Sequence, residues 1–140
     1  MSHGDTVHAS CVAVEARGLL ILGRSGSGKS SLALALMALG ADLVADDRVI
    51  LTPGPQGPVA SAPAALSGLI EARGLGILHA AARPSVVLAA AVDLDRVEAE
   101  RLPPPRVIAL AGTDLPLFHG QATPYFHAAL MQYLKAGRRA

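Results

Sequence analysis

The sequence predicts an α/β fold built around a phosphate-binding loop. Three observations lead to this prediction. The apolar stretch LLIL at residues 19–22 has the length of a buried strand, and it runs directly into the pattern G-x-x-x-x-G-K-S at residues 23–30. After this pattern, leucines recur at helical spacing at positions 32, 36 and 39. A strand, a glycine-rich loop and a helix in this order surround a polyanion with backbone N–H groups.

The elements on either side of the loop follow from the same kind of pattern. Residues 7–14 alternate loosely between apolar and polar side chains, which predicts a strand ahead of the loop strand. The helix after the loop begins near Lys29, and Gly40 is expected to end it. The 140 residues show no internal repeat and no second core, so residues 1–140 are expected to form one domain.

The next segment predicts a strand that carries two acidic residues. Residues 42–51 are mostly apolar, with Asp46 and Asp47 near the middle. Because successive strand residues point to opposite faces, one carboxylate can face the phosphate loop while the other faces away. Such a carboxylate can accept a proton or hold a metal, whereas the alternative is a surface turn with two solvated acids. Residues 53–63 are rich in Pro, Gly and Ala, which predicts a loop or a mobile flap near the site.

The C-terminal half predicts two more strands and a helix. Residues 86–94 and 107–111 read as apolar strands, joined by an excursion that ends in three prolines. Thr123 is expected to cap the last helix, with Pro124 at its first position, and Gly137 to end it. The expected apolar face of this helix consists of Phe126, Ala129, Leu130, Tyr133 and Leu134.

Composition excludes several classes of protein. Aromatic residues make up 3% of the chain and Trp is absent, so the core must be aliphatic. The net charge is +1 without a basic run, which argues against a nucleic-acid partner. Apolar windows such as residues 86–92 are too short to cross a bilayer, and no signal peptide is visible, so no membrane insertion is expected. Cys11 is the only cysteine, which indicates a reducing compartment and a cytoplasmic protein.

The loop pattern assigns roles to its last two residues. Lys29 is expected to reach the terminal phosphates of a nucleotide, and the hydroxyl of Ser30 to contact Mg²⁺. The alternative, a glycine-rich turn without a ligand, leaves the lysine unexplained. No Asn-Lys-x-Asp stretch that would bind guanine occurs, so a GTPase is disfavoured. The pattern alone does not distinguish a small-molecule kinase, an ATPase and a protein kinase.

Three further residues are candidates for the same site. His8 lies on the strand before the loop strand and can tune the proton affinity of a nearby carboxylate, although it can equally be an ordinary half-exposed histidine. Glu71 and Arg73 alternate in an extended segment at residues 69–80, where the carboxylate can bind Mg²⁺ and the guanidinium a phosphate. The alternative for these two is a surface ion pair.

Taken in order, four segments resemble one family. The segments VHAS around His8, LLILGRSGSGKSS, LVADDRV and IEARGLGI match the catalytic C-terminal domain of the bacterial HPr kinase/phosphorylase in order and spacing, over residues 6–80. The resemblance implies a mixed β-sheet in a fold shared with phosphoenolpyruvate carboxykinase. It also implies ATP- and Mg²⁺-dependent phosphorylation of a serine of HPr, a phosphocarrier protein, or of its nitrogen-related paralogue. The reverse reaction, phosphorolysis, is part of the same expectation.

Roles for individual residues follow from this resemblance. Asp46 is expected to be the catalytic base, assisted by His8, while Lys29 neutralises developing charge. Ser30 and Glu71 are expected to hold Mg²⁺ with Asp47 as a further metal contact, and Arg73 to contact phosphate. The expected nucleotide-binding residues are Gly23, Arg24, Ser25, Gly26, Ser27, Gly28, Lys29, Ser30 and Ser31.

The sequence also departs from the family pattern. The family's N-terminal regulatory domain is expected to be absent, as in the short alphaproteobacterial form, and Gln121 stands where the family has an arginine. The missing arginine predicts mainly kinase activity rather than phosphorolysis. Two other classes stay open: a nucleotide-sensing regulatory module with little catalysis, and a small-molecule kinase. Family members form hexamers, so a homo-oligomer is expected.

Overall fold

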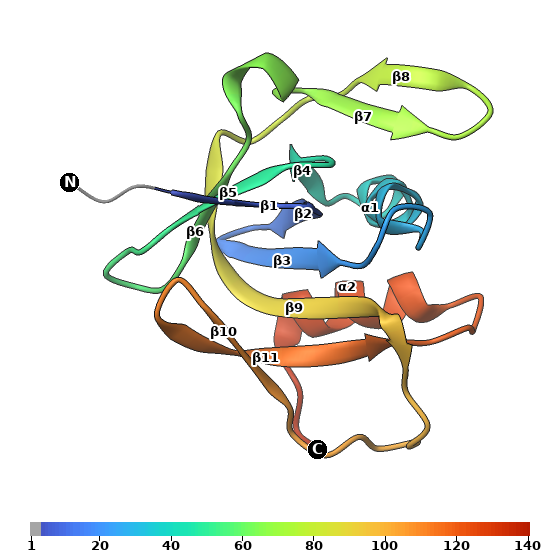
Figure 1. Ribbon diagram of the computed structural model, residues 1–140. Helices are drawn as coiled ribbons and strands as arrows, with labels where there is room; N and C mark the ends of the chain where they lie inside the picture. The colour runs from blue at the N-terminus through green and yellow to red at the C-terminus, as the bar shows by residue number, and fades with distance from the viewer. Residues whose placement is uncertain (1–3) are drawn as a thin grey trace.

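The structure, a computed structural model, describes residues 4–140 (Figure 1). It contains two α-helices, α1 (Lys29–Ala38) and α2 (Phe126–Ala136), and one 3₁₀ turn, η1 (Ala64–Leu66). The strands are β1 (Asp5–Val7), β2 (Ala9–Val14), β3 (Arg17–Leu22), β4 (Asp42–Ala45), β5 (Val49–Thr52), β6 (Val59–Ser61), β7 (Leu69–Ala72), β8 (Gly76–His79), β9 (Ser85–Val97), β10 (Val107–Leu110) and β11 (Thr113–Gly120).

A mixed β-sheet forms the centre of the molecule, which confirms the α/β fold. Its strands follow the order β1-β5-β6-β9-β3-β2-β4, and β11 and β10 extend it beside β9. The long strand β9 curves through the middle of Figure 1. It begins antiparallel to β6 and then runs parallel to both β3 and β11. The carboxyl ends of β3, β9 and β11 therefore lie together, at the edge where the phosphate loop begins.

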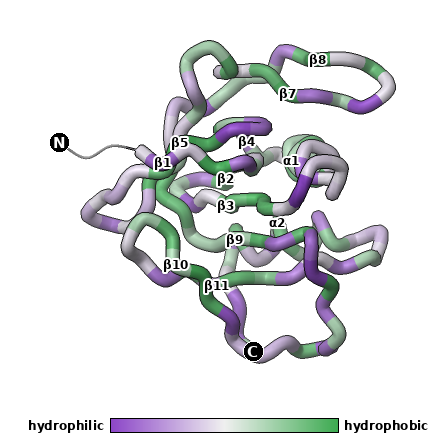
Figure 2. The backbone as a smooth tube through the Cα atoms, in the orientation of Figure 1, coloured by the Kyte–Doolittle hydropathy of each residue, from purple (hydrophilic) through white to green (hydrophobic). Residues whose placement is uncertain are grey.

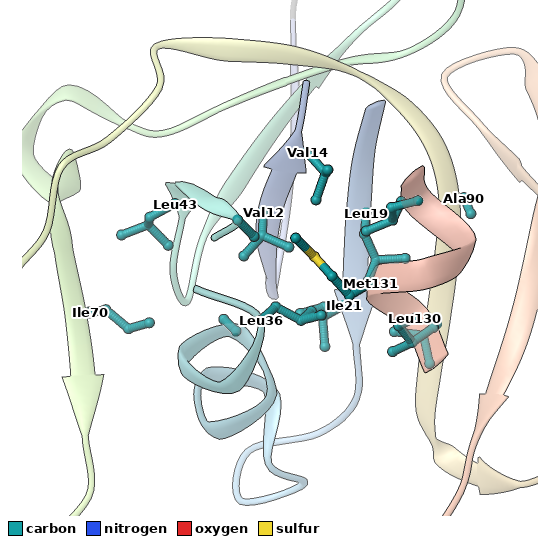
Figure 3. Close-up of a cluster of buried hydrophobic side chains, with 14 residues drawn as sticks. Val12, Val14, Leu19, Ile21, Leu36, Leu43, Ile70, Ala90, Leu130 and Met131 are labelled. Carbon is teal, nitrogen blue, oxygen red and sulfur yellow. The ribbon is translucent and has the colours of Figure 1, made fainter. Parts of the chain in front are cut away.

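Both faces of the sheet are buried. On one face, residues of β2 and β3 pack against α1 and α2, and Figure 3 shows Val12, Ile21, Leu36 and Met131 meeting in this cluster. The opposite face forms a second cluster around Leu20, whose neighbours come from β2, β4, β5, β6, β9 and β11. The tube coloured by hydropathy shows apolar segments concentrated in these central strands (Figure 2). As expected from the composition, the buried hydrophobic residues within 4–140 are aliphatic, with one Cys and one Met and no aromatic ring.

Cys11 belongs to the second cluster and is completely buried. This burial raises the pKa of its thiol, because the apolar surroundings disfavour the thiolate. We therefore expect no reaction with a thiol reagent such as Ellman's reagent at pH 8 in the native protein, and one equivalent after unfolding in guanidinium. Rapid stoichiometric labelling of the native protein would contradict the burial of this side chain.

Two predicted strands are each broken in two. Residues 7–14 form β1 and β2 with His8 in the bend between them, and residues 42–51 form β4 and β5 with 46–48 between them. The two breaks lie opposite one another, because β1 pairs with β5 while β2 pairs with β4. Asp47 has a φ of 69°, in the left-handed region that Asp and Asn tolerate better than most residues. The acidic pair therefore lies in a kink and not within a strand.

Residues 53–63 are not a mobile flap. Val59–Ser61 form β6, which pairs with β5 on one side and β9 on the other. Ala60 and Pro58 are fully buried, and the carbonyl of Pro58 accepts a hydrogen bond from the backbone N–H of Leu88. The segment completes a hairpin within the sheet, and its prolines and glycines lie mainly in the turn between β5 and β6.

The C-terminal region also differs from the prediction. Strand β11 occupies residues for which no element was predicted, and β9 extends three residues beyond Leu94. Helix α2 begins at Phe126 after Tyr125, without a side-chain cap, so Thr123 and Pro124 both precede the helix. Met131 is buried on its inner face, whereas Ala129 is exposed. Within residues 4–140, neither helix is long and apolar enough to cross a membrane.

Candidate active site

The phosphate loop links β3 to α1 and has the conformation that the glycine spacing predicts. Gly26 and Gly28 have φ values of 84° and 101°, which side chains other than glycine rarely adopt. A Cβ atom added at either position would meet nothing within 4 Å. The glycines therefore serve the backbone turn, and the space beside them stays open for a ligand at the N-terminus of α1.

Lys29 is buried within this loop, with 7% of its surface exposed. Its Nζ donates to the carbonyl of Gly23 at 2.6 Å and to the carbonyl of Arg24 at 3.0 Å. These two carbonyls accept two of the three N–H groups of the ammonium. The side chain is thus held at the loop, within reach of an anion that would replace the carbonyls as its partner.

Asp46 joins the loop to the neighbouring elements. Its Oδ1 accepts hydrogen bonds from the hydroxyls of Ser10 and Ser30, each at 2.7 Å. Its Oδ2 accepts from the backbone N–H of Glu71 at 3.1 Å. The carboxylate is 6% exposed, so these three donors occupy both oxygens of a buried group. Asp46 therefore connects β2, the start of α1 and β7, and it is poorly accessible to a substrate.

Asp47 has the opposite environment. Its Oδ1 lies 3.0 Å from Nε2 of His8, and the two side chains are 59% and 41% exposed. The sequence predicted that His8 assists Asp46, whereas in the structure the kink turns Asp47 and not Asp46 toward the histidine. An accessible carboxylate oriented by an imidazole is an arrangement typical of a general base.

Most of the predicted site residues converge on one cavity of about 160 Å³. Helix α1 and its loop form one wall, and the β7–β8 hairpin, seen beside α1 at the top of Figure 1, contributes another. The residues that line the cavity are His8, Ser25, Gly26, Gly28, Lys29, Ser30, Ser31, Asp47, Glu71 and Arg73. Gly23, Arg24 and Ser27 belong to the loop but do not line this cavity, and Asp46 does not line it either.

The donor atoms around the cavity fit a magnesium ion bound together with nucleotide phosphates. Ser30 donates its hydroxyl proton to Asp46, so the lone pairs of its oxygen remain available to a cation. The carboxylates of Asp47 and Glu71 line the same cavity. Among residues 4–140, no three His, Cys, Asp or Glu side chains form a metal-binding group by themselves. This suits Mg²⁺, which commonly takes one or two carboxylates and completes its shell with phosphate oxygens and water.

Sequence reasoning missed two residues at this site. Ser10 is completely buried, and its hydroxyl is one of the three donors to Asp46. Asp95, at the end of β9, accepts a hydrogen bond from the backbone N–H of Arg24 in the loop. A serine within an apolar strand was a usable signal for the first. No local pattern identifies the second, because its contact depends on β9 lying beside β3.

Gln121, which stands where the family has an arginine, and the nearby His119 lie away from the phosphate loop. His119 is on β11, and Nε of Arg106 lies 3.5 Å from its Nδ1. Gln121 follows β11 and accepts a hydrogen bond from the backbone N–H of Ala122. Neither residue lines the phosphate cavity.

Comparisons with known proteins agree with this geometry. Residues 1–83 match the model of the HPr Serine kinase C-terminal domain. An HPr kinase/phosphorylase of Levilactobacillus brevis is 43% identical over 79 residues, which are 56% of this chain and 25% of that protein. The Bordetella pertussis protein of the same name is 47% identical over 74 residues, 52% of this chain and 24% of that protein. The chain thus spans about a quarter of the length of the curated relatives it matches.

A solved structure extends the similarity to the C-terminal half. The structure of the Hpr(Ser) kinase/phosphatase from Coxiella burnetii superposes with a TM-score of 0.76 at 25% identity, covering 94% of this chain and 88% of that one. The mixed sheet, the phosphate loop and the cavity therefore occur in a fold that this kinase/phosphatase shares. Because the matching family model covers more than half of its residues, the chain belongs to the HPr serine kinase C-terminal domain family.

Proposed function

We propose that this domain is an ATP-dependent protein-serine kinase that phosphorylates HPr or a nitrogen-related HPr paralogue in the cytoplasm. The observation that carries the proposal is the convergence of the phosphate loop and the His8–Asp47 pair on one cavity. Phosphoryl transfer requires a positioned donor, cationic groups around the transferred phosphate and a base for the acceptor hydroxyl. The residues of the cavity can meet each of these requirements, and we infer the acceptor from the names of the relatives.

We assign the role of base to Asp47 and not to Asp46. Asp47 is accessible and paired with His8, whereas both oxygens of Asp46 are occupied by donors in a buried position. In the proposed reaction the acceptor serine oxygen bonds to the terminal phosphorus of ATP and its proton passes to Asp47. The bond between that phosphorus and the bridging oxygen breaks, and ADP leaves.

The remaining residues bind and orient. Lys29 exchanges the carbonyls of Gly23 and Arg24 for the nucleotide phosphates, and Arg73 approaches them from the hairpin turn. Mg²⁺, held by Ser30 and Glu71, would supply charge neutralisation to the phosphates when bound. Asp46 orients this group through its hydrogen bonds to Ser30 and to the backbone of Glu71.

We also propose that the forward reaction dominates over phosphorolysis. Gln121 and His119 lie outside the cavity, so neither of them takes the place of the family's late arginine there. Assembly into a homo-oligomer, which the resemblance implies, is part of the same proposal, and light scattering of the purified chain measures it.

The test of the function is transfer of labelled phosphate from ATP, with Mg²⁺, to purified HPr and to its nitrogen-related paralogue. Label is expected on a serine of one carrier, and a carrier with that serine changed to alanine is the matched control. ATP binding without label on either carrier would favour the nucleotide-sensing module instead. Release of pyrophosphate from the phosphorylated carrier and inorganic phosphate, at a rate close to that of the kinase reaction, would refute the dominance of the forward direction.

A further inference from the structure

We propose that Asp95 is a positioning residue that fixes the first turn of the phosphate loop and thereby sets the affinity for nucleotide phosphates. The effect on nucleotide affinity rests on the proposed function, whereas the contact between Asp95 and the loop does not depend on it. Asp95 lies at the carboxyl end of β9, outside the cavity and outside every motif that the sequence displays.

The contact involves both carboxylate oxygens of Asp95. They lie 3.2 and 3.1 Å from the backbone nitrogen of Arg24, which donates its N–H to them. Nε of Arg24 lies 3.5 Å from Oδ1 of the same carboxylate. The side chain of Arg24 is 84% exposed, so the ion pair contributes little, and the hydrogen bond from the backbone N–H is the contact that holds the loop.

The backbone carbonyl of Arg24 is also held by hydrogen bonds. Its carbonyl accepts hydrogen bonds from Nζ of Lys29 and from the backbone N–H of Ser27, both at 3.0 Å. Asp95 and Lys29 therefore hold the two ends of one residue with opposite charges. If Lys29 leaves this carbonyl for a phosphate, the hydrogen bonds to Asp95 and from the N–H of Ser27 remain to keep Arg24 in place.

The position of Asp95 follows from the sheet topology. Strand β9 runs parallel to β3, and Leu22, the last residue before the loop, pairs with Asp93. Many phosphate-loop proteins place a metal-binding aspartate at the end of a neighbouring strand. Here the carboxylates of the cavity, Asp47 and Glu71, come from other elements. The carboxylate at the end of β9 is therefore free to serve the backbone of the loop.

The backbone N–H of Arg24 needs an acceptor and not a charge, and this suggests a graded series of variants. Asp95→Ala removes the acceptor. Asp95→Asn keeps one carbonyl oxygen that can accept from the N–H, so it is expected to restore most of the function. Asp42→Ala is the matched control, because it removes an acidic side chain from an exposed ion pair with Arg83 and not from the loop.

The experiment measures two quantities on each folded variant: hydrogen exchange of the Arg24 and Ser27 amides in the free protein, and the Kd for ATP with Mg²⁺. We expect Asp95→Ala to speed exchange of both amides about tenfold or more and to raise the Kd about 5- to 20-fold with a smaller change in kcat. Asp95→Asn is expected to stay within about threefold of the wild type in both measurements. Asp42→Ala is expected to change neither.

Three outcomes would overturn the inference. One is an unchanged Kd in Asp95→Ala with a lowered melting temperature, which would indicate a merely structural residue. Another is an Asp95→Asn variant that binds ATP as weakly as Asp95→Ala, which would assign the effect to charge. The third is unchanged exchange of the two amides in Asp95→Ala. If the wild type bound no ATP, the proposed function would fail, and the exchange measurement would still decide whether Asp95 fixes the loop.

Discussion

Asp47→Asn is expected to slow phosphoryl transfer by about 10²- to 10⁴-fold. The carboxylate that accepts the proton of the acceptor serine becomes an amide, which is no base, while the shape of the side chain is preserved. The loop and Lys29 are untouched, so the Kd for ATP should stay within about threefold of the wild-type value. Single-turnover transfer of labelled phosphate to the carrier measures the rate, and calorimetric titration with a nonhydrolysable ATP analogue measures the affinity.

Asparagine is the appropriate substitution because of the backbone at this position. Asp47 has a φ of 69°, a conformation that Asn adopts readily and Ala does not. Nδ2 or Oδ1 of the amide can also keep a hydrogen bond to His8, which lies 3.0 Å from the carboxylate. Loss of activity in Asp47→Asn is then not attributable to a rearranged kink.

Asp46→Asn is the comparison that separates the two acids. Asp46 holds Ser30 and the backbone of Glu71, so its amide variant should weaken the binding of ATP with Mg²⁺ more than it slows the transfer step. The opposite pattern, with turnover lost in Asp46→Asn and retained in Asp47→Asn, would return the role of base to Asp46 and overturn the assignment made from the geometry.

Local patterns were sufficient to predict the centre of the fold. The strand, loop and helix around Lys29 are contiguous, and their apolar spacing and glycines act over a few residues. Helix α1 begins at Lys29, and Gly40 follows its C-cap, as expected. The residues that gather at the cavity were likewise predicted, because the spacing between the loop and the acidic pair matches one helix and one returning strand.

The roles of Asp46 and Asp47 were not predictable in the same way. The kink between β4 and β5 exists because each half pairs with a different strand: β4 with β2 and β5 with β1. Such pairing is decided by contacts distant in sequence, and no pattern within residues 42–51 records it. Strand alternation predicts that the two carboxylates face opposite ways, but it does not predict that Asp46 turns inward to Ser10 and Asp47 outward to His8.

Strands β6 and β11 were not predicted, because a proline precedes the first and lies within the second. Pro58 precedes β6, and Pro116 lies within β11. A proline lacks the N–H that a strand donates, so it counts against a central strand. Pro116 is tolerated because it pairs with Val107 of β10, and pairing with β9 begins only at Leu117.

Asp46→Ala is expected to lower the free energy of unfolding by about 2–4 kcal/mol. The substitution leaves the hydroxyl of the completely buried Ser10 without its acceptor, and it also removes the partner of Ser30 and of the backbone N–H of Glu71. A buried donor that loses its acceptor costs more than the hydrogen bond itself stabilised. Urea unfolding followed by circular dichroism measures the change.

The controls for this prediction are Asp42→Ala and Asp46→Asn. The Asp42–Arg83 ion pair is 51% and 28% exposed, so its loss should cost about 1 kcal/mol or less. In Asp46→Asn, Oδ1 can accept from the N–H of Glu71 while Nδ2 donates to a serine oxygen, because a hydroxyl group both donates and accepts. The loss of unfolding free energy in Asp46→Asn should therefore lie between the losses in Asp42→Ala and Asp46→Ala. If Asp46→Ala were no less stable than Asp42→Ala, the buried hydrogen bonds of Asp46 would not hold β2, α1 and β7 together, and its assignment as a positioning residue would fail.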